Sequence, residues 1–459
     1  MTAVCSFKER KACSVLLSAV LLTAGAFASP GAAHASMTAE LATCTGGEAP
    51  GNAASFSPAI SANGRYIAYH SNASNLVNND RNGVGDVFVR DGRVCRTALT
   101  SIGSGAVQGN NFSDAPSISA DGRYVAFASV AANLVNRDTN AASDIFVRDR
   151  KRGTTTRVSI SSSGTQANGP SYRPAISADV RYVVFSSRAS NLVPGDTNGT
   201  GDVFLRDLRR GTTERVSVST TGLQADGNSA GLDFQVAADT TGRYVVFGSE
   251  ASNLVAGDTN GARDVFVRDR KRRTTQRVNV SSDGSQADGG TSGTPAMSAN
   301  GRFVSFSSSA ANLVSGDTNG AFDMFVRDLV YGRTERVSVS SGGAQSNNTS
   351  VGDGQAMSAN GRYVTFLSAA SNLVPGDSND QFDIFVRDRQ RRVTQRVSVS
   401  TAGAQTDDYS VNEAISANGR YVVFASLAST LIPGDTNRDY DVYVRDRRLG
   451  TTKLVSAAA

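Results

Sequence analysis

The chain has 459 residues, of which 39% are apolar and 19% charged, so it can bury a sizeable core and is not disordered throughout. Its formal net charge of +5 is mild, so the positions of the basic residues matter more than their sum. Val, Ser, Thr, Gly, Asn and Asp are abundant, whereas Lys, Glu and Leu are scarce, and this balance favours short strands joined by turns.

Residues 1–35 have the pattern of a secretion signal peptide. A basic segment precedes the apolar run "ACSVLLSAVLLTAGAFA", and small-residue cleavage sites follow at Ala28 and Ala35. The run is too short to predict a membrane span with such flanks, although a retained N-terminal anchor is the alternative. We expect cleavage after Ala35 and a secreted or periplasmic protein whose mature chain has no transmembrane span.

Export bears on the four cysteines. Cys5 and Cys13 would be removed with the signal, which leaves Cys44 and Cys95 as an even pair. An even pair in an oxidising compartment predicts one disulfide between Cys44 and Cys95, with two unpaired thiols as the alternative.

The rest of the chain is built from seven copies of one unit. Each copy has four strand-length pieces, which in the third copy are "RPAISA", "RYVVFSS", "DVFLRD" and "TERVSVS". The copies are marked by an Arg-Tyr or Arg-Phe dipeptide that starts at Arg65, Arg123, Arg181, Arg243, Arg302, Arg362 and Arg420, at intervals of 58, 58, 62, 59, 60 and 58 residues.

Seven small four-stranded sheets can bury their faces and protect their edges by packing around an axis. The sequence therefore predicts an all-β fold, a seven-bladed β-propeller of four-stranded antiparallel blades, over residues 36–459 with about 59 residues per repeat. The ring closes between the chain ends, and either residues 38–45, "TAELATCT", or the C-terminal "TTKLVSA" can supply the closing strand.

The repeat resembles that of the TolB-type, WD-repeat-like β-propellers. The resemblance lies in "SPAISANGRYIAYHS" (57–71) and "APSISADGRYVAFAS" (115–129), each followed by "DVFVRD" or "DIFVRD". It implies a propeller with a scaffolding or binding role in the cell envelope, and related propellers also cap peptidases. It extends to the propeller only, because TolB-type proteins carry an α/β domain ahead of it and we expect only about twenty residues between the signal and the first blade.

Each repeat contains a loop such as "GDTNGTGD" (195–202), with the pattern Asp-x-Asn-x-x-x-Asp. These oxygen donors suit a weak calcium site, with affinity on the order of 10⁻⁴–10⁻³ M. The same residues also suit a tight turn in which the last Asp pairs with an Arg of the repeat, and we take the turn as the default. No other cofactor is predicted. The candidate calcium ligands are Asp80, Asn82, Asp86, Asp138, Asn140, Asp144, Asp196, Asn198, Asp202, Asp258, Asn260, Asp264, Asp317, Asn319, Asp323, Asp377, Asn379, Asp383, Asp435, Asn437 and Asp441.

Alternate loops of a propeller blade lie on opposite faces. The Asp-rich loops should share a polar face with the loops that enter the next blade, while turns such as "RKRG" (150–153) and "RKRR" (270–273) form a basic face. We expect these basic turns to be solvated, with attraction to an anionic polymer or to lipid headgroups as the alternative. In each third strand, an aromatic residue such as Phe146 and the following Arg148 should pack between blades.

No catalytic residues are predicted. His70 stands in a strand piece without partners for a triad, and "GNSAG" (227–231) lacks the strand-turn-helix context of a nucleophile elbow. We therefore expect a monomeric, non-catalytic scaffold that binds another envelope or extracellular protein, or a polymer, on its polar face. Nucleic acid is disfavoured because no aromatic residues interleave with the basic turns. An extracellular hydrolase or lyase that uses Asp carboxylates near the propeller axis is the alternative.

Overall fold

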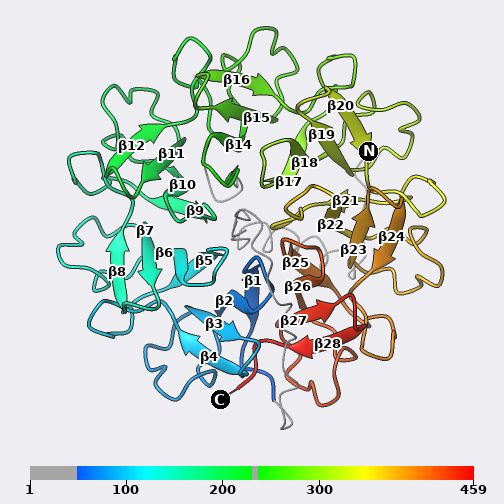
Figure 1. The fold of residues 1–459 in the computed structure, drawn as a ribbon, viewed down its shortest axis with the longest axis horizontal. Coiled ribbons are helices and arrows are strands. Elements are labelled where there is room, and N and C mark those ends of the chain that lie inside the picture. The colour runs from blue at the N-terminus through cyan, green and yellow to red at the C-terminus, as the bar shows by residue number, and fades with distance from the viewer. Residues whose placement is uncertain (1–48, 230–235, 459) are drawn as a thin grey trace, which may run out of the picture.

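The computed structural model describes residues 49–229 and 236–458. They form seven antiparallel sheets of four strands each, arranged as a ring around one axis (Figure 1). The predicted seven-bladed propeller is confirmed, and each blade is made of four strands that are consecutive in the sequence. In this part of the chain there is no helix long and apolar enough to cross a membrane.

The strands have the following bounds, blade by blade. Blade 1 contains β1 (Ser55–Ile60), β2 (Tyr66–Ser71), β3 (Asp86–Asp91) and β4 (Arg96–Leu99); blade 2 contains β5 (Ser113–Ile118), β6 (Tyr124–Ser129), β7 (Asp144–Asp149) and β8 (Thr154–Arg157); blade 3 contains β9 (Ser171–Ile176), β10 (Tyr182–Ser187), β11 (Asp202–Asp207) and β12 (Thr212–Arg215); blade 4 contains β13 (Val236–Ala238), β14 (Tyr244–Ser249), β15 (Asp264–Asp269) and β16 (Thr274–Arg277). Blade 5 contains β17 (Thr291–Met297), β18 (Phe303–Ser308), β19 (Asp323–Asp328) and β20 (Arg333–Arg336); blade 6 contains β21 (Ser350–Val351), β22 (Tyr363–Ser368), β23 (Asp383–Asp388) and β24 (Val393–Arg396); blade 7 contains β25 (Ser410–Ile415), β26 (Tyr421–Ser426), β27 (Asp441–Asp446) and β28 (Thr451–Leu454).

The core lies between the sheets and is built from the repeated aromatic and β-branched residues. In every blade an aromatic ring of the second strand stacks on one of the third strand, as Phe127 does on Phe146, with ring centroids 5.7 to 6.0 Å apart. These rings are fully buried. Such pairs stabilise a sheet beyond the area they bury, so the repeated aromatic residue fixes the register of each blade.

The predicted role of the third-strand Arg is confirmed at the interfaces between blades. Arg148 of blade 2 donates from Nη1 to the carbonyl of Gly103, in the loop that leaves blade 1, at 3.1 Å, and to the hydroxyl of Thr155 at 3.1 Å. Thr155 in turn donates to the carbonyl of Ile102. Burial lowers the pKa of the Arg148 guanidinium, whose hydrogen bonds offset that cost. The corresponding Arg residues of blades 3 to 7 are Arg206, Arg268, Arg327, Arg387 and Arg445.

The ring is closed by the C-terminal strand, which is one of the two predicted solutions. β28 completes blade 7, and the backbone amide of Ser55 in blade 1 donates to the carbonyl of Tyr440 in blade 7 at 2.7 Å. The same contact joins the other neighbouring blades, for example Ser113 to Gly85 at 2.9 Å. The amide of Gly51 also donates to the carbonyl of Ser456 at 3.0 Å, so the closing interface repeats the internal ones.

Several sequence predictions fall on residues outside the described ranges. These are the signal peptide at 1–35, its cleavage sites and the segment 38–45. Cys95 is disulfide-bonded, whereas Cys44, its predicted partner, lies outside the described residues, so the pairing stays a prediction.

Candidate functional site

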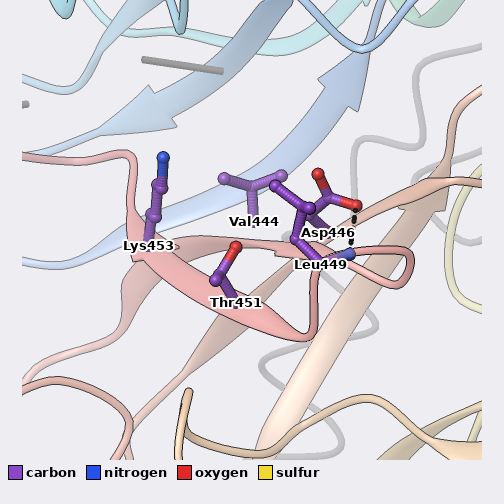
Figure 2. A pocket seen from close by; sticks show the side chains of 5 residues that line it. All are labelled: Val444, Asp446, Leu449, Thr451 and Lys453. Atoms are coloured by element: carbon purple, nitrogen blue, oxygen red, sulfur yellow. Dashed lines mark hydrogen bonds between the residues drawn. The ribbon is translucent and has the colours of Figure 1, made fainter. Parts of the chain in front are cut away.

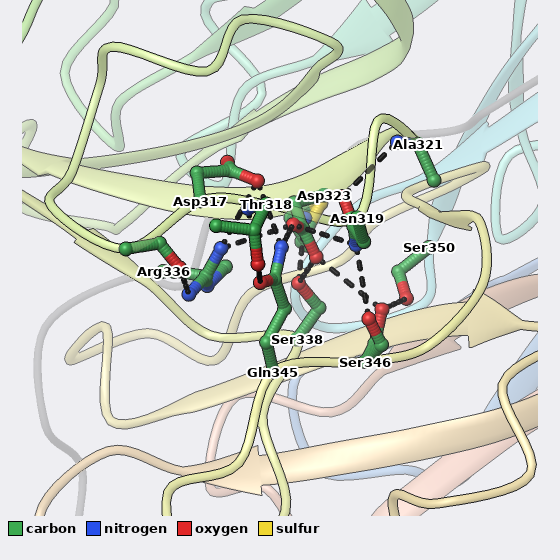
Figure 3. Close-up of polar contacts among 12 residues, drawn as sticks. Asp317, Thr318, Asn319, Ala321, Asp323, Arg336, Ser338, Gln345, Ser346 and Ser350 are labelled. Atoms are coloured by element: carbon green, nitrogen blue, oxygen red, sulfur yellow. Dashed lines mark hydrogen bonds and ion pairs between the residues drawn. The ribbon is translucent and has the colours of Figure 1, made fainter.

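The Asp-x-Asn-x-x-x-Asp loops are held by a dense set of contacts within each blade. Figure 3 shows the loop of blade 5, where Arg336 lies between the carboxylates of Asp317 and Asp323, at 3.2 Å and 3.3 Å. Gln345 donates to both carboxylates, at 2.7 Å and 2.9 Å, and Asn319 donates to Asp323 at 3.1 Å. The three predicted ligands therefore lie close together, and the guanidinium of Arg336 pairs with both of their carboxylates.

This Arg is present in five blades and replaced in two. Blades 2 to 6 have Arg157, Arg215, Arg277, Arg336 and Arg396, each paired with both Asp residues of its loop. The strand position in blades 1 and 7 holds Leu99 and Leu454. There Gln108 joins Asp80 to Asp86 in blade 1, at 2.7 Å and 2.9 Å, and the Tyr443 hydroxyl donates to Asp435 in blade 7.

These contacts favour the turn interpretation in blades 2 to 6, because the guanidinium supplies the positive charge that a cation would bring. Within the described ranges, no group of three or more His, Cys, Asp or Glu side chains is placed to hold a metal ion. Burial raises the pKa of loop carboxyl groups such as Asp258 and Asp317, and the Arg in the same blade lowers it. Calcium binding by the loops stays a prediction for measurement.

The other polar loops of this face are also engaged with each other. The amide of Asn110, after blade 1, donates to the Asn133 side chain of blade 2 at 2.9 Å, and Asn133 donates back to the carbonyl of Gln108 at 2.9 Å. At the ring closure the backbone amide of Asn52 likewise donates to the Asn75 side chain at 2.9 Å. The repeated Asn, Gln and Asp residues therefore serve the architecture, and a binding function has to come from residues that differ between blades.

The strongest departure from the repeat lies on the innermost strands, which surround the axis (Figure 1). The first strand of blade 6, β21, has only two residues, and Gly352, Asp353 and Gly354 follow it where other blades continue the strand. A Cβ atom on Gly354 would stand 2.0 Å from the carbonyl oxygen of Glu413, in β25 of blade 7. Gly354 thus lets the backbone of blade 6 approach blade 7 closely.

This approach creates a buried acidic cluster. The amide of Asp353 donates to Glu413 Oε1 at 3.2 Å, and Asn412 Nδ2 donates to Asp353 Oδ2 at 2.8 Å. Glu413 is fully buried, and its Oε2 has no hydrogen-bond partner among the described residues. Burial, with the nearby Asp353 carboxylate, raises the pKa of Glu413 to about 8, so its carboxyl group is mostly neutral at pH 7.

Other innermost strands carry different side chains at the second residue of the strand. Asp114 in β5 is half-buried, and burial raises its pKa to about 6 although Arg173 in β9 opposes that rise. Phe56 in β1 is also half-buried and lies 4.9 Å from the ring of Tyr440. In blade 3, the strand position that corresponds to Asp114 holds Tyr172, which is also half-buried. Asp114, Asp353, Asn412 and Glu413, together with Phe56 and Tyr172, are called the axial cluster below.

The single histidine within the described ranges, His70, has the surroundings of a packed side chain. His70 in β2 is almost fully buried, its ring lies 4.9 Å from that of Phe112, and burial lowers its pKa to about 4. It is therefore neutral at pH 7, and its contacts are those of a packed side chain. The axial cluster was missed by the sequence interpretation, although "VGDGQAM" (351–357) departs from the "SPAISA" pattern and marks the place.

The comparisons with known proteins concern the fold. No protein-family model matches the chain, and no curated protein matches it. Among solved structures, the β-propeller domain of the Trilobed protease from Pyrococcus furiosus, which has an open velcro topology, is similar with a TM-score of 0.52 and 10% identity, over 88% of this chain and 97% of that one. An oligogalacturonate lyase in complex with manganese is similar with a TM-score of 0.51 and 10% identity, over 84% and 87%.

TolB from Acinetobacter baumannii also matches, with a TM-score of 0.38 and 15% identity, over 68% of this chain. The chain spans 59% of the length of that protein. The predicted resemblance to TolB-type propellers is confirmed as a resemblance of fold. At these identities the similarities support the propeller fold only, so the function has to be inferred from the residues of the site.

Proposed function

We propose that the protein is an exported, non-catalytic propeller that binds a ligand at its axial cluster. The observation that carries this proposal is that several innermost strands carry buried or half-buried polar groups that differ from the repeat. The polar groups that the blades share make hydrogen bonds and ion pairs within the fold. Small-molecule sites in proteins are usually preformed and use a few placed polar groups to orient the ligand.

The composition of the axial cluster favours a ligand with a protonated amine. Asp353 and Asp114 are half-buried carboxyl groups, and Phe56 and Tyr172 offer aromatic surface on the innermost strands on either side of Asp114. Glu413 beside Asp353 is mostly neutral at pH 7, so Asp353 is the carboxylate that can pair with a cation. Carboxylates together with aromatic rings are the groups that recognise ammonium ions. A protein partner could supply such a group as a free N-terminus.

The test is a titration of a short neutral peptide with a free N-terminus against the same peptide with an acetylated N-terminus, followed by calorimetry. We expect binding of the free peptide only, and loss of at least about tenfold in affinity in Asp353→Asn, the size typical of a lost charge-assisted contact. The matched control is Asp380→Asn, which changes an exposed loop carboxylate whose backbone suits Asn. Equal binding of both peptides, or equal loss in both variants, would contradict the proposal.

An acid–base enzyme is the second candidate, and one observation favours it. Asp353 and Glu413 are neighbouring carboxyl groups, and the pKa of Glu413 is raised to about 8, as in pairs that divide the roles of base and acid. The fold similarity to an oligogalacturonate lyase suggests oligogalacturonate as the probe. Axial carboxylates would repel such a polyanion, so we expect no unsaturated product in an ultraviolet assay. Product formation that Glu413→Gln abolishes would favour the enzyme instead.

A further inference from the structure

The turns between the third and fourth strands carry a surface that the axial proposal does not use. Each of the seven turns, or the strand residue that follows it, carries at least one exposed Lys or Arg, for example Lys151, Arg210 and Arg272. The Asp that begins each turn pairs most closely with another Arg, as Asp149 does with Arg123 at 2.6 Å. Arg152 and Arg272 of the turns also lie 3.9 Å and 4.0 Å from the Asp of their own turn, but one carboxylate shared by two guanidinium groups leaves a net positive charge. The tips therefore form a positively charged ring.

Apolar side chains are concentrated on the same turns. Of the eight large apolar residues that are exposed in the described part of the chain, five lie on third-to-fourth-strand turns or directly beside them. Tyr331 is 68% exposed and Leu449 is 52% exposed. The five are Val94, Val330, Tyr331, Val393 and Leu449.

These apolar tips occupy neighbouring blades. They belong to blades 5, 6, 7 and 1, which are consecutive because the ring closes between blades 7 and 1 (Figure 1). Blades 2, 3 and 4 have the purely basic tips "KRG" (151–153), "RRG" (209–211) and "KRR" (271–273). Four consecutive blades thus have tips that are apolar and basic, and the other three have tips that are basic only.

The turns hold their side chains in fixed positions. Figure 2 shows the turn of blade 7, where the backbone amide of Leu449 donates to Asp446 at 3.2 Å and Lys453 lies on the strand that follows. The amide of Arg448 donates to the same carboxylate at 2.9 Å. At the start of the corresponding turn of blade 2, Arg150 stacks on Tyr66 of blade 1, with its guanidinium carbon 4.9 Å from the ring centroid. Leu449 is therefore presented to solvent by a turn that is tied at its base.

We infer that this surface docks on an anionic phospholipid membrane, with the apolar tips of blades 5, 6, 7 and 1 entering the headgroup layer. Basic residues attract an anionic lipid surface, and exposed aliphatic and aromatic side chains beside them gain by burial in the interface. Tyr331 is of the type that settles at the headgroup level. A soluble acidic polymer would use the charge but would gain nothing from Val393 or Leu449, and therefore the lipid surface is the occupant that explains both features.

The experiment is co-sedimentation of the full chain with vesicles of phosphatidylglycerol and phosphatidylcholine, compared with vesicles of phosphatidylcholine alone. We expect binding to the anionic vesicles that weakens as salt is added, because the surface potential is screened. The triple variant Tyr331→Ser, Val393→Ser, Leu449→Ser should bind roughly tenfold or more weakly, because it removes three apolar side chains that the membrane interface would bury. The N-terminal segment is the same in every protein compared.

The matched control is Val107→Ser, Leu223→Ser, which removes exposed apolar side chains that lie outside these turns. It should bind like the parent protein, and circular dichroism melts should show that all variants are folded. Equal loss in the control and in the triple variant would overturn the inference, as would binding that ignores vesicle charge. Binding to polyglutamate as strong as binding to the anionic vesicles, and unchanged in the triple variant, would also overturn it in favour of an acidic polymer.

Discussion

Replacing Arg277 by Leu tests what holds the Asp-rich loops. Arg277 Nη1 lies 2.9 Å from Asp264 and 3.2 Å from Asp258, and Nη2 donates to the carbonyl of Gly257 at 3.1 Å. The three side chains are 9%, 0% and 5% exposed, so the substitution leaves two poorly solvated carboxyl groups without their counter-charge. Removing one partner of a buried pair costs about 3–5 kcal/mol. With an unfolding entropy of about 2.1 cal/mol/K for each of the roughly 400 described residues, this lowers Tm by about 4–6 °C.

The assay is a thermal melt followed by circular dichroism at neutral pH, with and without calcium. Leu is a fair replacement because blades 1 and 7 carry Leu99 and Leu454 at the same strand position. The control is Arg152→Ala, whose side chain is 75% exposed and 3.9 Å from Asp149, and its Tm should stay within about 1 °C. A Tm of Arg277→Leu equal to that of the parent protein would refute the reasoning. Recovery of the lost stability by calcium would show that the vacated loop can take a cation.

Three further predictions concern pH, packing and metal. Glu413 has a pKa of about 8 in the folded protein against an ordinary 4.5, so its contribution to stability is present below about pH 4.5 and is lost as the pH rises to about 8. Glu413→Gln should therefore have a higher Tm than the parent protein above pH 8. A lower Tm of the variant at that pH would contradict the predicted direction of the effect. Gly354→Ala should be destabilised by a few kcal/mol because its Cβ meets the Glu413 carbonyl, whereas Gly105→Ala, whose Cβ meets only Val107 at 3.9 Å, should not, as chemical denaturation would measure. Calcium in millimolar excess should leave the Tm of the parent protein almost unchanged compared with EDTA, since an Arg already pairs with both carboxylates in the loops of five blades. A calcium-specific rise of many degrees would instead support the calcium interpretation.

The fold could be predicted from the sequence because its information is repeated. Seven copies of an alternating piece such as "DVFVRD" predict the third strand of each blade, its register and the number of blades together. A pattern that arose by chance in one copy would not recur in all seven. The Arg148 contact between blades was also predictable, since a charged residue that follows a core aromatic in every copy must find a repeated partner.

The axial cluster could not be predicted in the same way. Asp353 and Glu413 are 60 residues apart, and their contact depends on how closely two neighbouring strands approach, which Gly354 controls through the absence of a Cβ. The raised pKa of Glu413 follows from burial, and burial at the axis is not visible in a local pattern. The sequence does show the break in the repeat at residues 351–357, but a break alone does not distinguish a site from an insertion.

A repeat protein offers an internal comparison that replaces some of the information of homologues. Where the blades agree, as at the Arg–Asp pairs of their turns, the shared residue serves a need that all blades have, namely tying the end of the third strand to the start of the second strand of the same blade. Where a buried polar group occurs in one blade only, as Glu413 does, no shared need explains its burial, and the cost of burying it has to be met by something particular to that place. The axial cluster and the apolar tips of blades 5, 6, 7 and 1 are two such departures, one at the centre of the ring and one on its basic turns. Because they lie on different strands and turns, Asp353→Asn and the triple tip variant should each impair one function and leave the other intact.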